Sequence, residues 1–380
     1  MRTADRAREL PESGIRKFFE LAEARDDVIS LGVGEPDFSA PWAARNAAID
    51  GLERGRTSYT ANRGTVELRE AIAVHHERYD QSYDPGEEIL VTTGASEAVD
   101  LAFRTLVDPG DVVAIHEPSY ISYAPGVELA GGEPLSVPTR AVDDFALTPD
   151  RLEAAGAGEA DLLVLCYPNN PTGATMTDAQ LAEVATFCRE NDLRVVADEI
   201  YSALTYRGDH ASIATQPGMR ERTVVVNGFS KAYAMTGLRL GYALGPADVI
   251  DAMNRIHQYT MLSAPTTAQI AALEALRSCD DEVTEMVEEY NRRRRLVVSR
   301  FNAMGLDTFE PGGAFYAFPE CGGDDEAFAE ALLEAEGVAV VPGSVFGAGG
   351  EGHLRVSYAT SMRELKEATD RIARFLEERD

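Results

Sequence analysis

The chain has 380 residues, 44% of them hydrophobic and 26% charged, which is the composition of a globular protein large enough for two domains. Its 64 acidic and 35 basic side chains give a formal net charge of −29, and a surface of that sign repels nucleic acid and anionic membranes. The charged N-terminus MRTADRARELPESG lacks the apolar core of a secretory signal, and no apolar run is long enough to span a membrane, so we expect a cytoplasmic protein.

The acidic residues are spread along the whole chain, and arginine has almost replaced lysine. Only Lys17, Lys231 and Lys366 remain. We interpret this balance as that of a halophilic protein, whose acidic side chains keep it hydrated in high salt. Recruitment of a basic partner would also use an acidic surface, and a GC-rich genome would also replace lysine by arginine, so both of these causes stay open.

Short apolar runs alternate with longer helical patterns between residues 65 and 245. Strands are predicted at 88–93, 112–118, 161–168, 193–201, 223–229 and 239–245, and helices at 65–79, 96–107, 119–130 and 177–191. The strands are apolar almost throughout, which is typical of a sheet covered on both faces. This alternation predicts an α/β sheet wound with helices.

The pattern changes after residue 245. Helices are predicted at 246–259, 264–277 and roughly 280–304, followed by strand–helix–strand–helix over 306–380. We therefore predict a large domain at 45–275 and a smaller lobe that combines residues 1–44 with residues 276–380.

Unusual segments follow the predicted strands at the point where each strand ends. TTGASEA follows the first strand, HEPSY the second and YPNNPTG the third, while ADEIY ends the fourth and NGFSK ends the fifth. Ligands of α/β proteins bind at the carboxyl ends of the strands. These five segments therefore predict a single ligand-binding crevice.

Lys231 lies in the largely apolar segment NGFSKAYAMTGLRLGY. A lysine amine shielded from water has a lowered pKa and can form a Schiff base with a carbonyl compound, whereas the ordinary alternative is a surface lysine on a loop. Eight residues later, Arg239 could clamp a phosphate bidentately or pair with one of the many carboxylates.

Gly94, Ala95 and Ser96 form a turn between a predicted strand and a predicted helix. Small residues there allow backbone N–H groups to approach a phosphate at the helix N-terminus. The alternative is an ordinary N-cap by Ser96, with Glu97 favourable in the first turn.

Polar side chains near the other strand ends suit a flat, charged ligand. Asp198, at the end of a buried strand, needs a cationic partner, which a protonated ring nitrogen or an arginine would supply. Tyr201 follows three residues later, Asn170 could donate a hydrogen bond into the crevice, and Tyr120 could stack on a ring or pack in the core. Arg355, in a strand-like run, requires either a substrate carboxylate or a protein carboxylate.

Together these groups match pyridoxal 5′-phosphate, a phosphorylated aromatic aldehyde with a basic ring nitrogen. A lysine would supply the imine, an arginine and a small-residue turn the phosphate site, an aspartate the partner of the ring nitrogen, and a tyrosine the stacking face. The sequence therefore predicts this cofactor.

The motifs YPNNPTG, ADEIY, NGFSKAYAMTGLRLGY and LRVSYAT, in this order and spacing, resemble the class I/II aminotransferases of the aspartate aminotransferase fold, above all archaeal aromatic and aspartate-type enzymes. The resemblance extends from VISLGVGEPDF (28–38) through GAFYAF (313–318) to VAVVPGSVFG (338–347). It implies a mostly parallel central sheet wound with helices, a smaller α/β lobe built from both termini, and a homodimer with shared active sites.

The resemblance also implies a role for each candidate residue. Lys231 would carry the cofactor and move the α-proton, Asp198 would keep the pyridine nitrogen protonated, and Arg355 would bind the substrate α-carboxylate. By the same resemblance, Tyr201 and Asn170 would hydrogen-bond the ring hydroxyl, and Tyr120 would stack on the ring. The phosphate would be bound by Arg239, Ser230, Gly94, Ala95 and Ser96, and by Tyr59 of the neighbouring subunit. Gly34 and Asn170 would help to bind the substrate carboxylate. Many members have a serine where this chain has Gly228, so one phosphate-binding hydroxyl is missing.

The expected function is transamination between an amino acid, aspartate or an aromatic one, and a 2-oxo acid, with 2-oxoglutarate as the expected acceptor. A pyridoxal-phosphate-dependent carbon–sulfur β-lyase is the alternative, because it would use the same lysine, aspartate and arginine. No Gly-x-Gly-x-x-Gly after a strand, no Gly-Lys-Ser/Thr loop and no His-Glu-x-x-His occurs, so neither a dinucleotide site nor a metal site is expected.

Overall fold

The computed structural model describes residues 3–10, 14 and 27–379 of the chain. Residues 1–2, 11–13 and 15–26 of the predicted small lobe lie outside the described residues, as does residue 380. The first described element is the short helix α1 (Asp5–Glu9).

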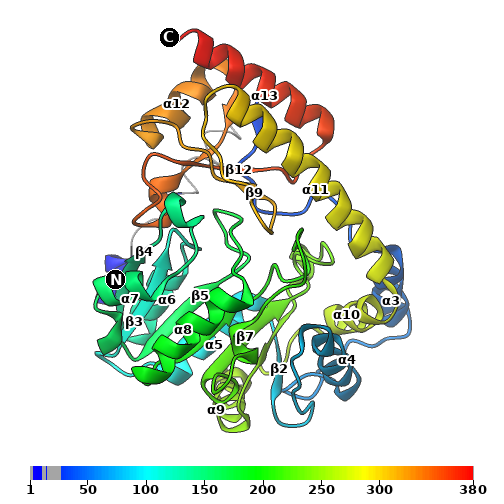
Figure 1. The fold of residues 1–380 in the computed structure, drawn as a ribbon. Coiled ribbons are helices and arrows are strands. Elements are labelled where there is room, and N and C mark those ends of the chain that lie inside the picture. The colour runs from blue at the N-terminus through cyan, green and yellow to red at the C-terminus, as the bar shows by residue number, and fades with distance from the viewer. Residues whose placement is uncertain (1–2, 11–13, 15–26, 380) are drawn as a thin grey trace.

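A seven-stranded sheet forms the centre of the larger part of the molecule (Figure 1). Its strands lie in the order β2 (Ile89–Thr92), β8 (Gly241–Leu244), β7 (Thr223–Gly228), β6 (Arg194–Asp198), β5 (Leu162–Cys166), β3 (Val112–Glu117) and β4 (Glu133–Pro138). From β7 to β4 all neighbours pair in parallel, whereas β8 is antiparallel to both β2 and β7. The predicted mostly parallel α/β sheet is thus confirmed.

Helices cover both faces of this sheet because successive strand residues point to opposite sides. Along β5, Leu163 and Leu165 face a core shared with α8 (Asp178–Glu190), while Leu162 and Val164 face a core shared with α5 (Ala95–Leu106). On the α8 side the cover is completed by α3 (Trp42–Glu53), α4 (Val66–His76), α7 (Pro149–Ala154) and α10 (Thr266–Ser278), and on the α5 side by α6 (Tyr123–Ala130) and α9 (Ala247–Thr260). Burial on both faces explains why the strand sequences are apolar throughout.

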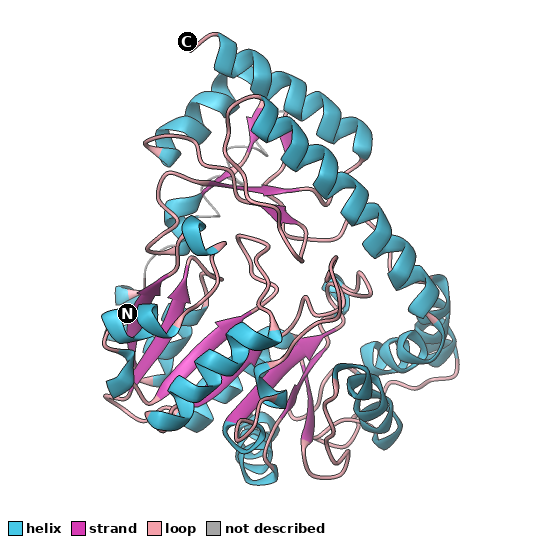
Figure 2. Ribbon diagram, viewed as in Figure 1, coloured by secondary structure: helices cyan, strands magenta, loops and turns pink. Residues whose placement is uncertain are grey.

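A third apolar core lies under the C-terminal helices, above the large sheet in Figures 1 and 2. The long helix α11 (Asp280–Ala303) leads into it from the side of α3 and α10. Short strands β9 (Tyr316–Ala317), β11 (Val341–Pro342) and β12 (Leu354–Ser357) form a small sheet, β1 (Ile29–Ser30) pairs with β10 (Val338–Ala339), and α12 (Asp325–Glu336) and α13 (Met362–Glu377) cover them. The pairing of β1 with β10 supports our proposal that both termini contribute to one smaller lobe.

Three local predictions differ from the structure. Strand β4 was not predicted, because its sequence EPLSVP is mostly solvent-exposed at the sheet edge and lacks the apolar run of the inner strands. The helix predicted at 119–130 begins only at Tyr123, since residues before it form a turn. Past α12 the chain forms three short strands where one was expected.

Candidate active site

Lys231 lies in the turn that follows β7, and the side chain is half-buried. Its Nζ donates a 2.6 Å hydrogen bond to the carbonyl oxygen of Gly34 and lies 5.8 Å from the ring centroids of Tyr201 and Phe315. Burial lowers the pKa of Lys231 to about 8, although the nearby carboxylate of Glu35 acts in the opposite direction. The neutral amine, which is the nucleophilic and basic form, is therefore well populated near pH 8.

Asp198 is the last residue of β6, and its carboxylate is buried in the same crevice. The hydroxyl of Tyr123 donates to Oδ2 at 2.7 Å, and the backbone N–H of Ile200 donates to Oδ1 at 3.1 Å. Burial nevertheless raises the pKa of Asp198 to about 6. A carboxylate in this position gains most from a cationic ligand, because such a ligand offsets the cost of burying its charge.

The turn at residues 94–96 and Arg239 meet at the start of α5. Gly94 is the N-cap residue of α5 with φ 81°, so the alternative of an N-cap by Ser96 is wrong. A Cβ atom on Gly94 would lie 2.7 Å from Nη2 of Arg239, and one on Gly241 would lie 2.3 Å from the backbone nitrogen of Ala95. Glycine at both positions lets the exposed guanidinium and the helix N-terminus converge, which is the arrangement that binds a phosphate.

Arg355 is buried in β12 and is held by uncharged acceptors. Its Nη1 donates to Oδ1 of Asn170 at 2.9 Å, and its Nη2 donates to the carbonyl oxygen of Gly32 at 2.5 Å. Its Nε has no hydrogen-bond partner among the described residues. No carboxylate of the described part of the chain is paired with this guanidinium, so the site favours an acidic ligand.

Three tyrosines form walls of the crevice. The hydroxyl groups of Tyr201 and Tyr316 are 3.0 Å apart, and the ring centroid of Tyr316 lies 4.8 Å from Cζ of Arg355. Tyr120 packs edge-to-face against Tyr123, with ring centroids 5.5 Å apart. The crevice thus joins aromatic faces to the charged groups, as a flat charged ligand requires.

Most of the predicted site residues converge, and Tyr59 differs from them in its exposure. Ser230 is buried next to Lys231, but the side chain of Tyr59 is 81% exposed. Sequence reasoning did not assign Tyr123 or Tyr316. Tyr316 lies in the GAFYAF motif, and Tyr123 follows Tyr120 by three residues, so both were within reach as aromatic residues beside recognised segments.

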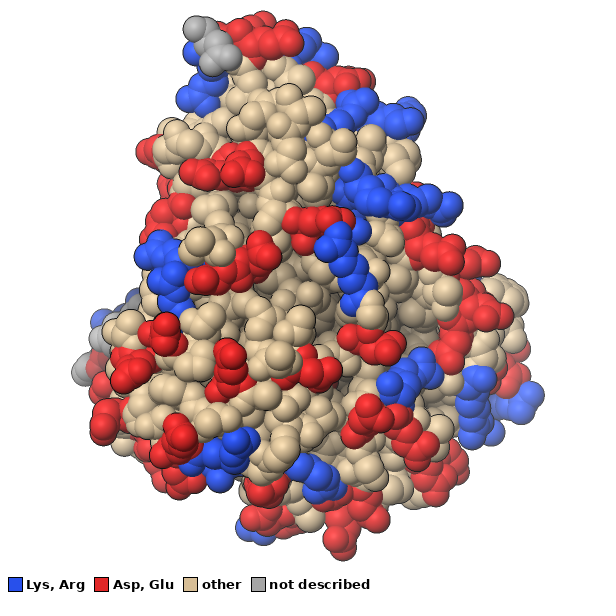
Figure 3. All heavy atoms as spheres, in the orientation of Figure 1, with Lys and Arg blue, Asp and Glu red and all other residues tan. Residues whose placement is uncertain are grey.

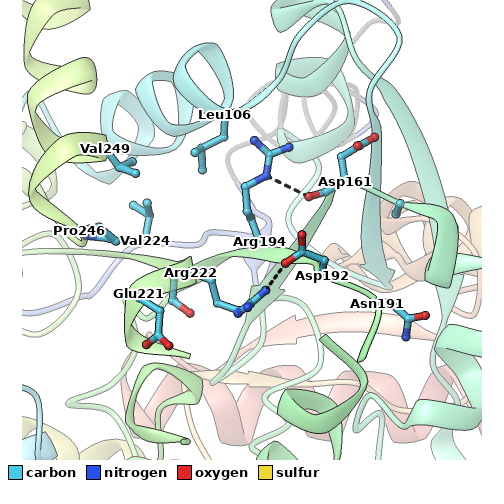
Figure 4. A pocket seen from close by; sticks show the side chains of 12 residues that line it. Leu106, Asp161, Asn191, Asp192, Arg194, Glu221, Arg222, Val224, Pro246 and Val249 are labelled. Carbon is cyan, nitrogen blue, oxygen red and sulfur yellow. Dashed lines mark hydrogen bonds and ion pairs between the residues drawn. The ribbon is translucent and has the colours of Figure 1, made fainter. Parts of the chain in front are cut away.

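A separate cavity of about 580 Å³ lies at the other end of the strands, where β6 and β7 begin (Figure 4). Two ion-paired arginines, Arg194 and Arg222, line it, and Arg222 contacts Asp192 at 3.0 Å. This cavity contains none of the predicted site residues.

A helix long and apolar enough to cross a bilayer is not found among the described residues.

Comparison with known proteins gives the class of the molecule. The chain matches the family "Aminotransferase class I and II" over residues 26–372. It is 51% identical over 377 residues to the Bacillus subtilis protein YugH, with 98% of each chain covered. It is 42% identical to aromatic-amino-acid aminotransferase 2 of Thermococcus litoralis, with 100% of this chain and 99% of the relative covered. Among solved structures it resembles aspartate aminotransferase from Thermus thermophilus with maleate, at a TM-score of 0.92, 39% identity, and 98% and 100% coverage.

The chain therefore belongs to the class I and II aminotransferases. It is a pyridoxal-phosphate-dependent enzyme that transfers amino groups between amino acids and 2-oxo acids, as the sequence predicted. The carbon–sulfur lyase alternative is not favoured by these relatives.

The crevice fits this cofactor on structural grounds. A partly neutral lysine amine, a buried carboxylate with a raised pKa, and an arginine at a helix N-terminus correspond to its aldehyde, its ring nitrogen and its phosphate. The open Nε of Arg355 remains for an acidic substrate.

Proposed function

We propose that the enzyme transfers the amino group of aspartate or an aromatic amino acid to 2-oxoglutarate in the crevice around Lys231. The observation that carries the site assignment is the partly neutral amine of Lys231 in a crevice that also contains Asp198, Arg239 and Arg355, each of which acts on its pKa. The similarity to an aromatic-amino-acid aminotransferase and to an aspartate aminotransferase supports the choice of amino donor.

Each of these side chains has a distinct task in this proposal. When bound, pyridoxal phosphate supplies an aldehyde and an electron-accepting ring that makes the α-carbon acidic. Arg355, with Asn170 and the backbone at Gly34, binds the α-carboxylate and orients the α-hydrogen. The Nζ of Lys231 takes up this proton and later returns it, because a pKa of about 8 suits both steps near neutral pH.

The remaining residues hold the cofactor. Asp198 pairs with the ring nitrogen and keeps it protonated, while Tyr201 and Asn170 hydrogen-bond the ring hydroxyl and Tyr120 stacks on the ring. The phosphate binds Arg239, Ser230 and the turn at residues 94–96. Gly228 provides no hydroxyl there, and a Cβ atom at this position would lie 3.0 Å from Cα of Gly241.

Substitution of Lys231 tests the assignment. Lys231→Ala should lose the absorbance of the cofactor–lysine adduct and reduce turnover by a factor of at least about 10³, because a nucleophile and a proton carrier are removed together. Lys366→Ala is the matched control, since Lys366 is exposed on α13. Mixing the wild-type holoenzyme with aspartate, alanine, tyrosine or phenylalanine and following its conversion to the pyridoxamine form would identify the donor. Full activity of Lys231→Ala would refute the assignment.

We also propose a homodimer in which Tyr59 reaches the phosphate of the partner subunit. The side chain of Tyr59 is 81% exposed, and other apolar side chains are exposed on α3, at the end of α9 and just beyond it, namely Trp42, Ile49, Leu52, Tyr259, Met261 and Leu262. Asn62 ties the Tyr59 segment to the carbonyl oxygen of Leu262 at 2.6 Å. Sedimentation should give twice 41.2 kDa, and Leu52→Asp should lower that mass together with cofactor affinity.

A cytoplasmic location and adaptation to high salt complete the proposal. Both are supported by the net charge of −29, and acidic side chains are scattered over the face shown in Figure 3 with basic ones between them. We further propose that residues 45–275 form the large domain and residues 1–44 and 276–380 the small one, a division supported by the core under the C-terminal helices, which is distinct from the two cores that flank the large sheet.

A further inference from the structure

Glu199 is a second buried carboxylate directly behind Asp198. Its backbone N–H still donates to the carbonyl oxygen of Val226 at 2.8 Å, so it extends the pairing of β6 with β7 by one residue. Consecutive residues of an extended strand point to opposite faces. Asp198 therefore faces the crevice with Tyr123, whereas Glu199 faces the side of the sheet that is covered by α4.

Three side chains surround the Glu199 carboxylate. Nε2 of Gln81 donates to Oε2 at 3.0 Å, Nε2 of His210 lies 3.1 Å from the same oxygen, and the hydroxyl of Ser212 donates to Oε1. The side chains of Glu199 and His210 are each only 4% exposed. Each of the two carboxylate oxygens thus accepts from at least one donor, which is the condition for burying an ionised carboxylate.

The hydrogen bonds continue from Gln81 to His76 and Tyr242 in one direction. Because the Gln81 amide nitrogen donates to Glu199, its Oε1 accepts from Nδ1 of His76 at 2.6 Å. Burial lowers the pKa of His76 to about 4, so the ring is neutral and its Nε2 accepts from the hydroxyl of Tyr242 at 2.9 Å. Each donor in this series of hydrogen bonds points toward Glu199, so the negative charge is located on that residue.

Stability alone does not account for two adjacent buried carboxylates. Both lose hydration, and the charge of Glu199 acts to raise the pKa of Asp198. A neutral glutamine of the same shape would remove this repulsion, although its amide nitrogen could not accept a hydrogen bond from Gln81, His210 or Ser212. The charge has a direct use, however, if Asp198 is paired with a cation, because a second negative charge behind it strengthens the binding of that cation.

We propose that Glu199, held by His210, Ser212 and Gln81, is a positioning residue that fixes the end of β6 and favours the protonated ring nitrogen of the cofactor at Asp198. This inference rests on the proposed role of Asp198. The ionisable groups that interact electrostatically with Glu199 are Asp198 on the same strand and His76, Tyr79, Tyr83, His210 and Tyr242 from the packed elements, and Arg78 acts in turn on His76, Tyr79 and Tyr242.

Glu199→Gln and Glu199→Asp separate charge from shape. In the Glu199→Gln holoenzyme we expect kcat to fall about tenfold with little change in KM, and the pH midpoint of the cofactor absorbance to move by about one unit, since one pKa unit corresponds to a factor of ten. Glu199→Asp, which keeps the charge, should recover most of the absorbance midpoint. Ser212→Ala removes one donor to the same carboxylate but leaves its charge, so the midpoint should move by less than in Glu199→Gln, and this variant serves if Glu199→Gln does not fold.

Asp161→Asn is the matched control. Asp161 lies at the other end of the strands, just before β5, and its carboxylate accepts a hydrogen bond from the backbone N–H of Val112 at 2.9 Å. Loss of this carboxylate should change thermal stability but not the absorbance midpoint. Wild-type kcat and midpoint in Glu199→Gln would overturn the inference, and so would equal losses in Glu199→Gln and Glu199→Asp. Asp198→Asn distinguishes the two levels: if that variant keeps turnover, the proposed role of Asp198 fails, whereas if it is inactive and Glu199→Gln is normal, only the inference about Glu199 fails.

Discussion

Burial shifts the pKa values of individual residues in the crevice away from those of the same side chains in water. Lys231 is partly neutral near pH 8, and Asp198 is partly protonated near pH 6, because both are buried before a ligand is bound. Such residues lower the stability of the cofactor-free protein and raise its affinity for a charged ligand, so function and stability oppose each other at these positions.

Asp198→Asn should therefore stabilise the cofactor-free protein. Burial raises the pKa of Asp198 from 3.8 to about 6, so the folded state holds more protons than the unfolded state between these values, and the contribution of Asp198 to stability is lost as pH rises through this window. Above pH 6 the variant should gain up to about 3 kcal/mol in free energy of unfolding while losing activity, and at pH 3.5 it should gain little. Urea unfolding at both pH values measures this; a gain that does not depend on pH would contradict it.

Tyr123→Phe tests the hydrogen bond that orients Asp198. Removing the hydroxyl leaves Oδ2 without its 2.7 Å donor and raises the pKa of Asp198 further. Because a hydrogen bond to a charged group contributes about 1.5–3 kcal/mol, we expect kcat/KM to fall roughly 10- to 100-fold. Tyr167→Phe is the matched control, since this buried hydroxyl donates to the carbonyl oxygen of Phe145 at 2.9 Å and should affect stability only. Equal rates in the two variants would argue against an orienting role.

At the scale of elements, the site depends on how closely β8 approaches the start of α5. The segments that carry Gly94, Asn170 and Lys231 follow β2, β5 and β7 of the large sheet, so the register of this sheet fixes the distances between them. Gly241 pairs with Thr92 on one side and Gly228 on the other, and α5 starts directly above it. Small residues at this junction bring the helix N-terminus to the phosphate site.

Gly241→Ala should consequently weaken cofactor binding more than it alters chemistry. The added methyl group would meet the backbone of Ala95 at 2.3 Å, so the start of α5 must move. Overpacking of this kind costs about 1–3 kcal/mol, and we expect the dissociation constant of pyridoxal phosphate to rise about tenfold or more. Fluorescence titration of the cofactor-free protein measures it. Gly237→Ala, where a Cβ atom meets nothing within 4 Å, should bind normally, and a normal Gly241→Ala would show that α5 does not need this position.

For the molecule as a whole, the dominant feature is the charge of −29, which repels itself in the folded state. Potassium chloride at about 2 M shortens the Debye length to about 2–3 Å and should raise the melting temperature above that in about 0.1 M salt. A triple variant of the exposed α11 residues, Glu282→Gln, Glu285→Gln and Glu288→Gln, should respond less to salt. A melting temperature that falls with salt would contradict the halophilic interpretation.

Local sequence pattern was enough to predict the class of fold and much of the candidate site. Apolar runs of strand length can be buried only in a sheet covered on both faces, and the residues at their ends, such as Lys231 and Asp198, must then share one edge. The lysine stood out because the chain has so few, Arg239 because it lies eight residues after Lys231, and Gly94 because small residues occupy a turn between a strand and a helix. Such inferences depend on local pattern, which is visible in a single amino-acid sequence.

The hydrogen-bond partners of the buried polar groups could be identified only from the folded structure. Tyr123 meets Asp198 across 75 residues of sequence, Arg355 meets Asn170 across 185, and Glu199 receives its donors from Gln81 and the loop at 210–212. The N-cap at Gly94 and the exposed edge strand β4 were likewise outside the reach of pattern. Pairings between distant residues depend on the packing of helices against the sheet, and no local periodicity encodes them.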